Sequence, residues 1–147
     1  GALSIRGTGS LTNPAYAGAV AWSAYRESIR TVEVASGITN LPDFAFYGCS
    51  ALETVSFAEG SRLTTIGGST FNGCTSLKEL TLPQGVKTIY GNAFRGCSNL
   101  VSVYLPDTVS YITGGAFRDC GKVVLSVARD SYAKQYAISN GIAYVER

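Results

Sequence analysis

The sequence contains no histidine, and this absence removes several kinds of chemistry at once. Histidine is the commonest general base, the usual activator of a nucleophilic side chain and the commonest metal ligand in proteins. Ten carboxylates remain, but Glu33, Glu53 and Glu79 fall at different positions of the repeat unit, so the periodicity places no acid/base pair together. We therefore predict that the protein is not an enzyme, has no catalytic residues, holds no metal and needs no cofactor.

Long apolar runs and strong charge are also missing. No stretch approaches the roughly 18 apolar residues of a membrane span, and the formal charge of +2 is spread over 147 residues without a basic stripe. We expect no membrane span in this chain and no nucleic-acid partner. The chain begins at Gly1 rather than methionine, which suggests a processed or trimmed chain. The lack of a signal peptide therefore carries no information about export.

What the sequence does contain is one phrase that recurs four times. In each copy a phenylalanine is followed three residues later by cysteine, and the phenylalanines lie 25, 23 and 23 residues apart. A period in the twenties marks a repeat architecture, in which each unit buries its apolar face by stacking on its neighbours. We predict a single domain over residues 1–147, with repeats at 29–51, 52–76, 77–99 and 100–122, an N-terminal cap at 1–28 and a C-terminal cap at 123–147. The recurring structural residues are Phe46, Phe71, Phe94, Phe117, Cys49, Cys74, Cys97 and Cys120.

Each unit also contains a short alternating stretch, such as Leu80-Thr81-Leu82, which predicts a strand with its apolar side chains turned inward. A second apolar pair, such as Val86 and Ile89, then enters the core, and a short helical or irregular turn carries the phenylalanine and cysteine. Stacked units predict a parallel sheet along one face of the molecule. Only the second unit is longer, and its two extra residues lie near positions 59–62, where a turn can absorb them.

The cysteines are the sharpest candidates for chemistry. Equivalent positions in a stack form a line with one rung every 4.7–4.9 Å or so, which puts Cys49 and Cys120 about 14 Å apart, too far to share a metal. Neighbours such as Cys74 and Cys97 fall within the Cα separation of a disulfide, about 4.4–6.8 Å, but their side chains run parallel rather than toward each other. We expect buried free thiols that behave as small apolar groups.

Candidate binding residues are the outward-facing positions of the predicted strands. They include one large side chain, Tyr104, of the kind that dominates interfaces; the alternative is that these positions are simply solvent-exposed strand residues. Tyr90 and Tyr111 lie outside the core positions and either border a sugar- or protein-binding patch or cover a turn. The two outward columns are Thr31, Thr54, Glu79, Ser102 and Glu33, Ser56, Thr81, Tyr104.

The sequence at each end of the chain predicts a cap, which keeps the terminal unit of a stack from exposing its core. Residues 2–11 alternate like a strand pair broken by glycines, and Asn13-Pro14 predicts a helix start followed by an aromatic face. The members of that face are Trp22, Tyr25 and Ile29. At the other end we predict a strand at 123–127, a helix beginning at Asp130-Ser131 and ended by Asn140-Gly141, and a final strand at 142–145.

The phrase from Leu82-Pro83 to Leu100 resembles the BspA-like class of bacterial leucine-rich repeats. The resemblance implies an α/β fold: a right-handed leucine-rich-repeat solenoid with short parallel strands on a concave face and irregular or short helical turns on the convex face. It also implies a non-catalytic protein-interaction module of an exported or cell-surface bacterial protein. Its partners would be host or neighbouring-cell proteins, with extracellular-matrix proteins as the partner class, and we expect a monomer. A rigid spacer that presents another domain and a carbohydrate-binding module are the alternatives.

Overall fold

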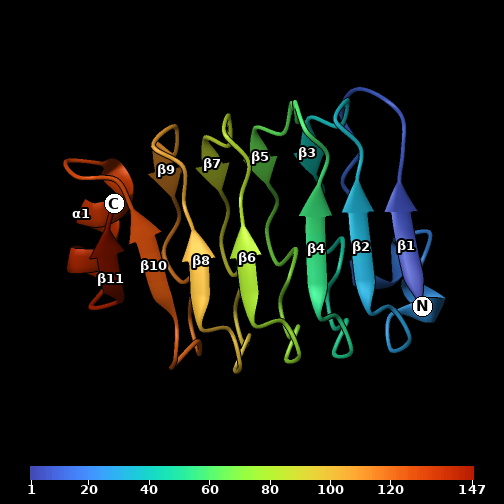
Figure 1. Ribbon diagram of the computed structural model, residues 1–147. Helices are drawn as coiled ribbons and strands as arrows, with labels where there is room; N and C mark the ends of the chain where they lie inside the picture. Colours follow the sequence, from blue (N-terminus) through green and yellow to red (C-terminus); the bar gives the residue numbers. More distant parts are fainter.

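The structure is a computed structural model that describes residues 1–147. The chain winds as a coil, and each complete coil places one strand on a first side of the molecule and a two-residue strand on a second side (Figure 1). All paired strands are parallel. This arrangement confirms the predicted solenoid, because each segment meets the equivalent segment of the next coil.

The first side carries the strands that the sequence predicts from its alternating stretches. Their inward residues are apolar and their outward residues are mostly small or polar, as for a sheet with one face on the core. We call the outward surface of these strands the strand face. The strands are β1 (Ala2–Ile5), β2 (Thr31–Val34), β4 (Thr54–Phe57), β6 (Glu79–Thr81), β8 (Ser102–Tyr104), β10 (Val124–Val127) and β11 (Ala143–Glu146).

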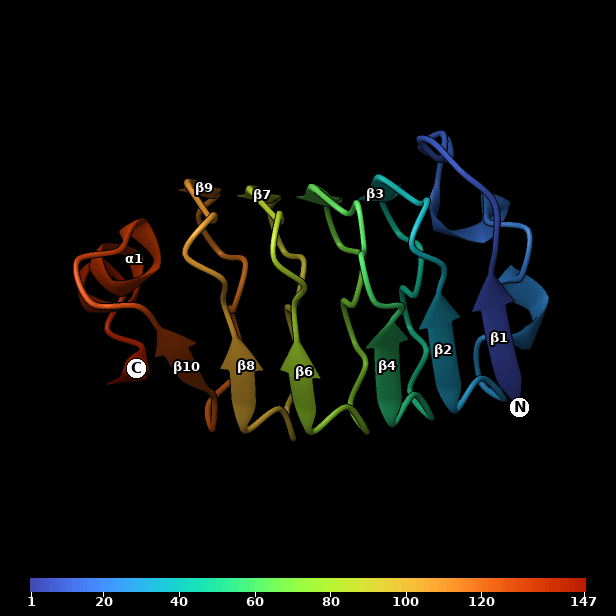
Figure 2. The ribbon, with the colours of Figure 1, turned by 45° about the horizontal axis from the view of Figure 1, so that its top comes forward.

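The second apolar pair of each repeat also ends in a strand, which the sequence analysis did not predict. These strands form an uninterrupted four-stranded sheet along the second side, drawn above the strand face in Figure 2. Only two residues per coil take part, so no alternation is visible in the sequence. The strands are β3 (Asn40–Leu41), β5 (Thr65–Ile66), β7 (Thr88–Ile89) and β9 (Tyr111–Ile112).

The third side consists of tight turns that carry the phenylalanines and cysteines. In every coil the residues two before and two after the phenylalanine have positive φ, a conformation that costs an L-residue roughly 1–2 kcal/mol and that glycine adopts freely. Glycine occupies the second position after the phenylalanine in three of the four copies, because it adopts positive φ without this cost. The positions after it are Gly48, Gly73, Gly96 and Asp119, and those before it are Phe44, Ser69, Asn92 and Gly115.

The phenylalanine rings form one stacked column through the core of 36 buried residues. Successive centroids lie 5.3, 5.3 and 4.9 Å apart from Phe46 to Phe117. Trp22 stacks on the first ring at 6.0 Å, and Tyr136 meets the last ring at 6.3 Å. The column therefore runs the length of the molecule and ends against a cap residue on each side.

The cysteines form a second column beside the rings. All four are buried and free. The Cys74 thiol donates a hydrogen bond to the Phe46 carbonyl oxygen at 3.2 Å, and the Cys97 thiol donates to the Phe71 carbonyl at 3.1 Å. The Cys120 Sγ atom makes the equivalent bond at 2.8 Å. These three thiols thus connect their own turns to the turn of the coil before.

The N-terminal cap differs from the sequence prediction. No α-helix follows Asn13-Pro14; the segment contains two short 3-10 turns, η1 (Ala17–Ala19) and η2 (Ser23–Tyr25). The amide of Asn13 instead accepts a hydrogen bond from the Asp43 N–H at 2.9 Å. The predicted face is confirmed for Trp22, which stacks on Phe46, and for Ile29, which is buried, but it is wrong for Tyr25, which is 66% exposed.

The expected strand pair at residues 2–11 is wrong as well. β1 pairs with β2, and Gly9 bridges to Ile38 on the second side, so the segment is an additional coil rather than a hairpin. Asn40 extends this coil, because its side-chain amide accepts from the Leu11 N–H and donates to the Leu11 carbonyl. Strand periodicity alone cannot tell whether a segment pairs with itself or with the next coil.

The C-terminal elements lie where the sequence places them. β10 is followed by α1 (Tyr132–Ser139), whose first turn is capped by the Ser131 side chain accepting from the Lys134 N–H at 3.1 Å. Gly141 has φ +64° just past the helix end. β11 then pairs with β10, and α1 packs beside them at this end of the coil (Figure 1).

Candidate binding face

All eight predicted binding residues lie on the strand face, and the sheet register pairs them as neighbours. Their side chains are exposed except for Thr31 and Tyr104, which are half-buried. Short strands hold them rigidly, because the inward residues of the same strands are locked in the core. The cross-strand pairs are Thr31 with Thr54, Glu33 with Ser56, Glu79 with Ser102, and Thr81 with Tyr104.

Tyr104 is less available than its sequence position predicts. The Arg147 guanidinium carbon lies 3.9 Å from the centre of its ring, and the Gln84 amide donates to its hydroxyl at 3.1 Å. Arg147 also donates to the Leu105 carbonyl oxygen at 2.6 Å, which fixes it over the ring. One face of the only large side chain in the two columns is therefore already occupied by a cation–π contact.

The strand face is divided into two sheets. Strands β1, β2 and β4 form one, strands β6, β8, β10 and β11 form the other, and no ladder joins β4 to β6. Both ribbon views show a wider gap between β4 and β6 than between other neighbouring strands of this side (Figures 1 and 2). We call this gap the seam. Nothing in the sequence analysis predicts it.

The hydrogen bonds at the start of each strand show where the seam begins. The Arg30 carbonyl oxygen accepts from the N–H groups of Glu53 and Thr54 at 2.8 and 3.2 Å, which starts the pairing of β4 with β2. The equivalent Glu53 carbonyl accepts from neither Lys78 nor Glu79. The strands therefore separate from their first residue onward.

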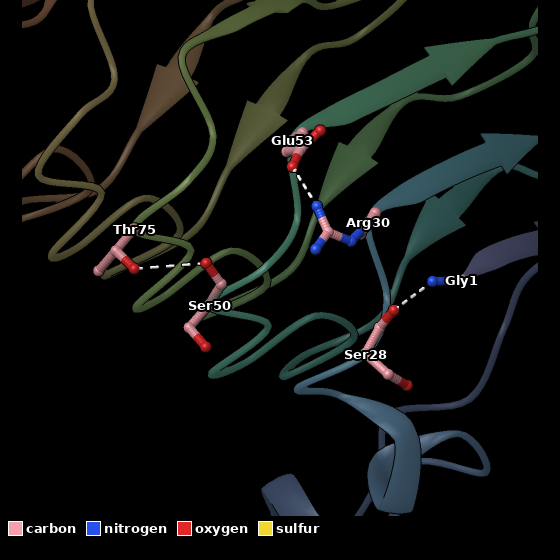
Figure 3. Close-up of polar contacts among 6 residues, drawn as sticks. All are labelled: Gly1, Ser28, Arg30, Ser50, Glu53 and Thr75. Atoms are coloured by element: carbon pink, nitrogen blue, oxygen red, sulfur yellow. Dashed lines mark hydrogen bonds and ion pairs between the residues drawn. The ribbon is translucent and has the colours of Figure 1, made fainter.

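The two coils remain connected everywhere else. Before the seam, the Thr75 hydroxyl donates to the Ser50 carbonyl at 3.4 Å, as Figure 3 shows. After it, β5 and β7 pair, and the Tyr90 N–H donates to the Ile66 carbonyl at 3.0 Å. The seam is therefore an opening in one side of a coil whose other two sides are continuous.

The seam forms a groove of about 520 Å³, a size within the range of small ligand sites. The inward residues of β4, Val55 and Phe57, are only half-buried, whereas those of β2 and β6 are buried. Val55 and Leu80 form an apolar floor between polar walls. Its walls include Glu53, Thr54, Lys78, Glu79 and Thr81.

Charges are few on this face and mostly exposed. Arg30 forms an ion pair at 2.8 Å with Glu53 in the groove wall (Figure 3), and both side chains are more than half exposed. Such a pair contributes at most about 1 kcal/mol and is readily exchanged for another partner. Glu79 forms no ion pair.

A second hollow of about 290 Å³ lies on the side of β4 that faces away from the seam, and Arg6 and Glu33 are among its walls.

The thiols of Cys49 and Cys74 are poorly suited to catalysis. Burial raises the pKa of Cys49 to about 11, an effect that the Arg26 charge only partly offsets. Burial also raises the pKa of Cys74 well above its usual value. A nucleophilic cysteine needs the opposite shift, because the thiolate is the reactive form. No group of His, Cys, Asp or Glu residues is arranged to hold a metal ion.

The remaining candidate aromatics lie away from the strand face. Tyr111 belongs to β9 and Tyr90 follows β7, so both lie on the second side, where they are 51% and 45% exposed. Neither lies in one of the hollows described above.

No helix in the structure combines the length and apolar character needed to cross a bilayer.

Comparison with known sequences agrees with the repeated turn. The pattern of the BspA type leucine rich repeat region matches residues 20–139 in six copies. The chain belongs to the BspA-type leucine-rich-repeat family. The family match begins inside the N-terminal cap, and β1 lies before its first residue. Proteins of this family are repeat scaffolds and are generally non-catalytic. None of the curated proteins matches this chain.

Solved structures of bacterial leucine-rich repeat proteins share the fold. A leucine-rich repeat protein of T. pallidum is 28% identical, with a TM-score of 0.68 over 80% of this chain and 51% of its own. One from Bacteroides ovatus is 24% identical, with a TM-score of 0.74 over 99% of this chain and 36% of its own. A third, from Eubacterium ventriosum, is 20% identical, with a TM-score of 0.61 over 84% of this chain and 39% of its own. This BspA-type chain therefore spans about a third to a half of their length.

Proposed function

We propose that this domain is a non-catalytic protein-interaction module that binds a partner protein through the strand face. The observation that supports this most directly is that the recurring residues and the varied residues lie on different sides of the coil. The recurring residues are buried in the core and turns, while the strand face carries residues that differ from coil to coil and two hollows that flank β4. A rigid surface with varied side chains is suited to recognising a shaped protein partner.

The proposal extends to location and partner class. Membership in the BspA-type family supports an exported or cell-surface bacterial protein that adheres to host or neighbouring-cell proteins, with extracellular-matrix proteins as the first partners to test. The site would consist of the eight outward residues, centred on Glu33 and Ser56 rather than on Tyr104, whose ring is covered by Arg147. A single copy of the chain presents the whole face, so binding requires no oligomer.

The test uses immobilised purified matrix proteins and the soluble domain in biolayer interferometry. Glu33→Arg combined with Ser56→Arg changes two neighbouring positions of the strand face. Thr65→Arg combined with Thr88→Arg is the matched control, because these residues are neighbours on the second side. We expect the first pair to weaken binding by at least about tenfold, as for residues at the centre of an interface, and the control pair to leave it unchanged.

A different result would favour the spacer. If no matrix protein binds, or if both double variants bind like the original, the strand face is not the site of adhesion. The stacked column from Trp22 to Tyr136 would then serve to hold a neighbouring domain at a fixed distance.

A further inference from the structure

The seam exposes main-chain hydrogen-bonding groups from its β4 side. The N–H groups of Thr54 and Ala58 donate to carbonyls of the β2 coil, at 3.2 and 3.0 Å. Successive N–H groups of a strand point to opposite sides. The N–H groups of Val55 and Phe57 therefore point into the seam, where no strand is paired with them.

The β6 side mirrors this arrangement. The Leu82 N–H donates to the Tyr104 carbonyl oxygen at 3.2 Å, which directs the even-numbered residues of this strand toward β8. The N–H groups of Glu79 and Thr81 accordingly point into the seam. Two open sheet edges thus face each other across a groove with an apolar floor.

We propose that the seam binds an extended segment of the partner polypeptide, which adds as a strand between β4 and β6. This deepens the proposed function and rests on it. An open edge is a template for pairing with another chain, and strand addition obtains its affinity from main-chain hydrogen bonds. The outer edges at β1 and β11 offer one row of such groups, whereas the seam offers two rows at once.

The coil can make room for the guest strand. Neighbouring strands lie about 4.7–4.9 Å apart, so a strand between β4 and β6 needs these two edges roughly 9–10 Å apart. Opening the seam further leaves the other connections in place, because β5 pairs with β7 and the Gly48 N–H donates to the Asn72 carbonyl at 2.8 Å. Some Cα atoms of β4 and β6 now lie within 8 Å of each other, so accepting the guest requires these two strands to move apart by a few ångströms at most.

The walls of the groove define the chemistry of the guest. Its inward side chains meet Val55 and Leu80 above an already filled core, so they are small and apolar. Its outward side chain in the row of Thr54 and Glu79 lies beside the carboxylate that forms no ion pair. A basic residue fits there, since opposite charges on neighbouring strands attract. The guest is an extended segment that alternates small apolar with polar residues and carries one Lys or Arg.

The experiment uses peptides of roughly six residues, the usual strand length, with small apolar residues at alternate positions. They are displayed on phage and selected on the whole domain, and the affinity of enriched peptides is measured by fluorescence polarisation. Thr81→Pro removes one N–H group that points into the seam and keeps the β8 ladder, while Thr81→Val keeps the N–H and removes only the hydroxyl. We expect Thr81→Pro to weaken binding by about tenfold or more and Thr81→Val to have no effect.

Amide hydrogen exchange of the original domain provides a second measurement that does not depend on the proline variant folding. Addition of a selected peptide is expected to slow exchange at Val55, Phe57, Glu79 and Thr81. Protection at β1 or β11 instead, no enriched peptide, or equal binding by both Thr81 variants would overturn the proposal. If the selected peptides no longer bind the Glu33→Arg, Ser56→Arg double variant but bind the Thr81→Pro variant as tightly as the original, then the strand face binds peptides and the seam does not.

Discussion

The turn side and the strand side of the coil are built from the same repeats but hold together differently. On the turn side, phenylalanine rings stack from coil to coil at 4.9–5.3 Å, and three of the four thiols donate hydrogen bonds to the preceding turn. On the strand side the residues vary, and the sheet is interrupted between β4 and β6. Because the turn side and the continuous sheet of the second side both connect the coils across the seam, the strand side is free to vary and even to open.

The largest expected effect comes from removing one ring of the stacked column. Phe94 is fully buried and has a ring on each side. Phe94→Ala removes both contacts and leaves a cavity, so we expect it to lower the free energy of unfolding by about 3–5 kcal/mol in urea denaturation. On the strand side, Ser102→Ala is expected to change it by less than about 0.5 kcal/mol, since the residue is exposed. Similar losses for the two variants would remove the distinction between the sides.

A smaller effect is expected from the backbone of the same turns. Gly96 has φ +71°, so Gly96→Ala is expected to cost about 1–2 kcal/mol although a Cβ atom would meet no close contact there. Gly121 lacks a positive φ and has open space around it. Gly121→Ala should therefore leave stability unchanged or raise it by up to about 1 kcal/mol. Thermal unfolding of the two variants compares them directly, and an equal response would mean that the turn conformation stores no strain.

The smallest effect concerns β11, the last strand of the strand side, which is attached to α1 by charge rather than by a deep core. A hydrogen bond from Lys134 lowers the pKa of the Glu146 carboxyl below its usual value of 4.5. A carboxyl with a lowered folded-state pKa stabilises the fold above its unfolded pKa, and this contribution is lost as the pH falls through the folded value. Melting temperatures between pH 7 and pH 3 or so should fall slightly less for Lys134→Gln than for the original chain. Parallel pH profiles would show that the pair contributes nothing to stability.

Predictability from sequence follows the same division. The turn residues and inward strand residues recur because every coil needs the same ring, thiol and apolar side chain, so four copies suffice to predict the solenoid. The two-residue strands β3, β5, β7 and β9 were missed because such short pairs show no period. The cap after Asn13-Pro14 was misjudged because packing of Trp22 on Phe46 determines its path rather than helix propensity.

The candidate site was predictable in its residues but not in its shape. Alternation placed all eight outward residues on one face. The seam and the covered ring of Tyr104 depend on contacts between distant segments, such as Arg147 over Tyr104, which no local pattern contains. The one available signal for the seam was the longer second repeat, since its two extra residues follow β4.

The column that begins at Trp22 and ends at Tyr136 has a consequence for how such proteins change size. Each internal ring meets a ring before it and a ring after it, so a duplicated segment of one period would find matching neighbours on both sides. Whole repeats can therefore be added or removed while both caps keep the same contacts. The number of coils, and with it the length of the domain, is then free to change under selection.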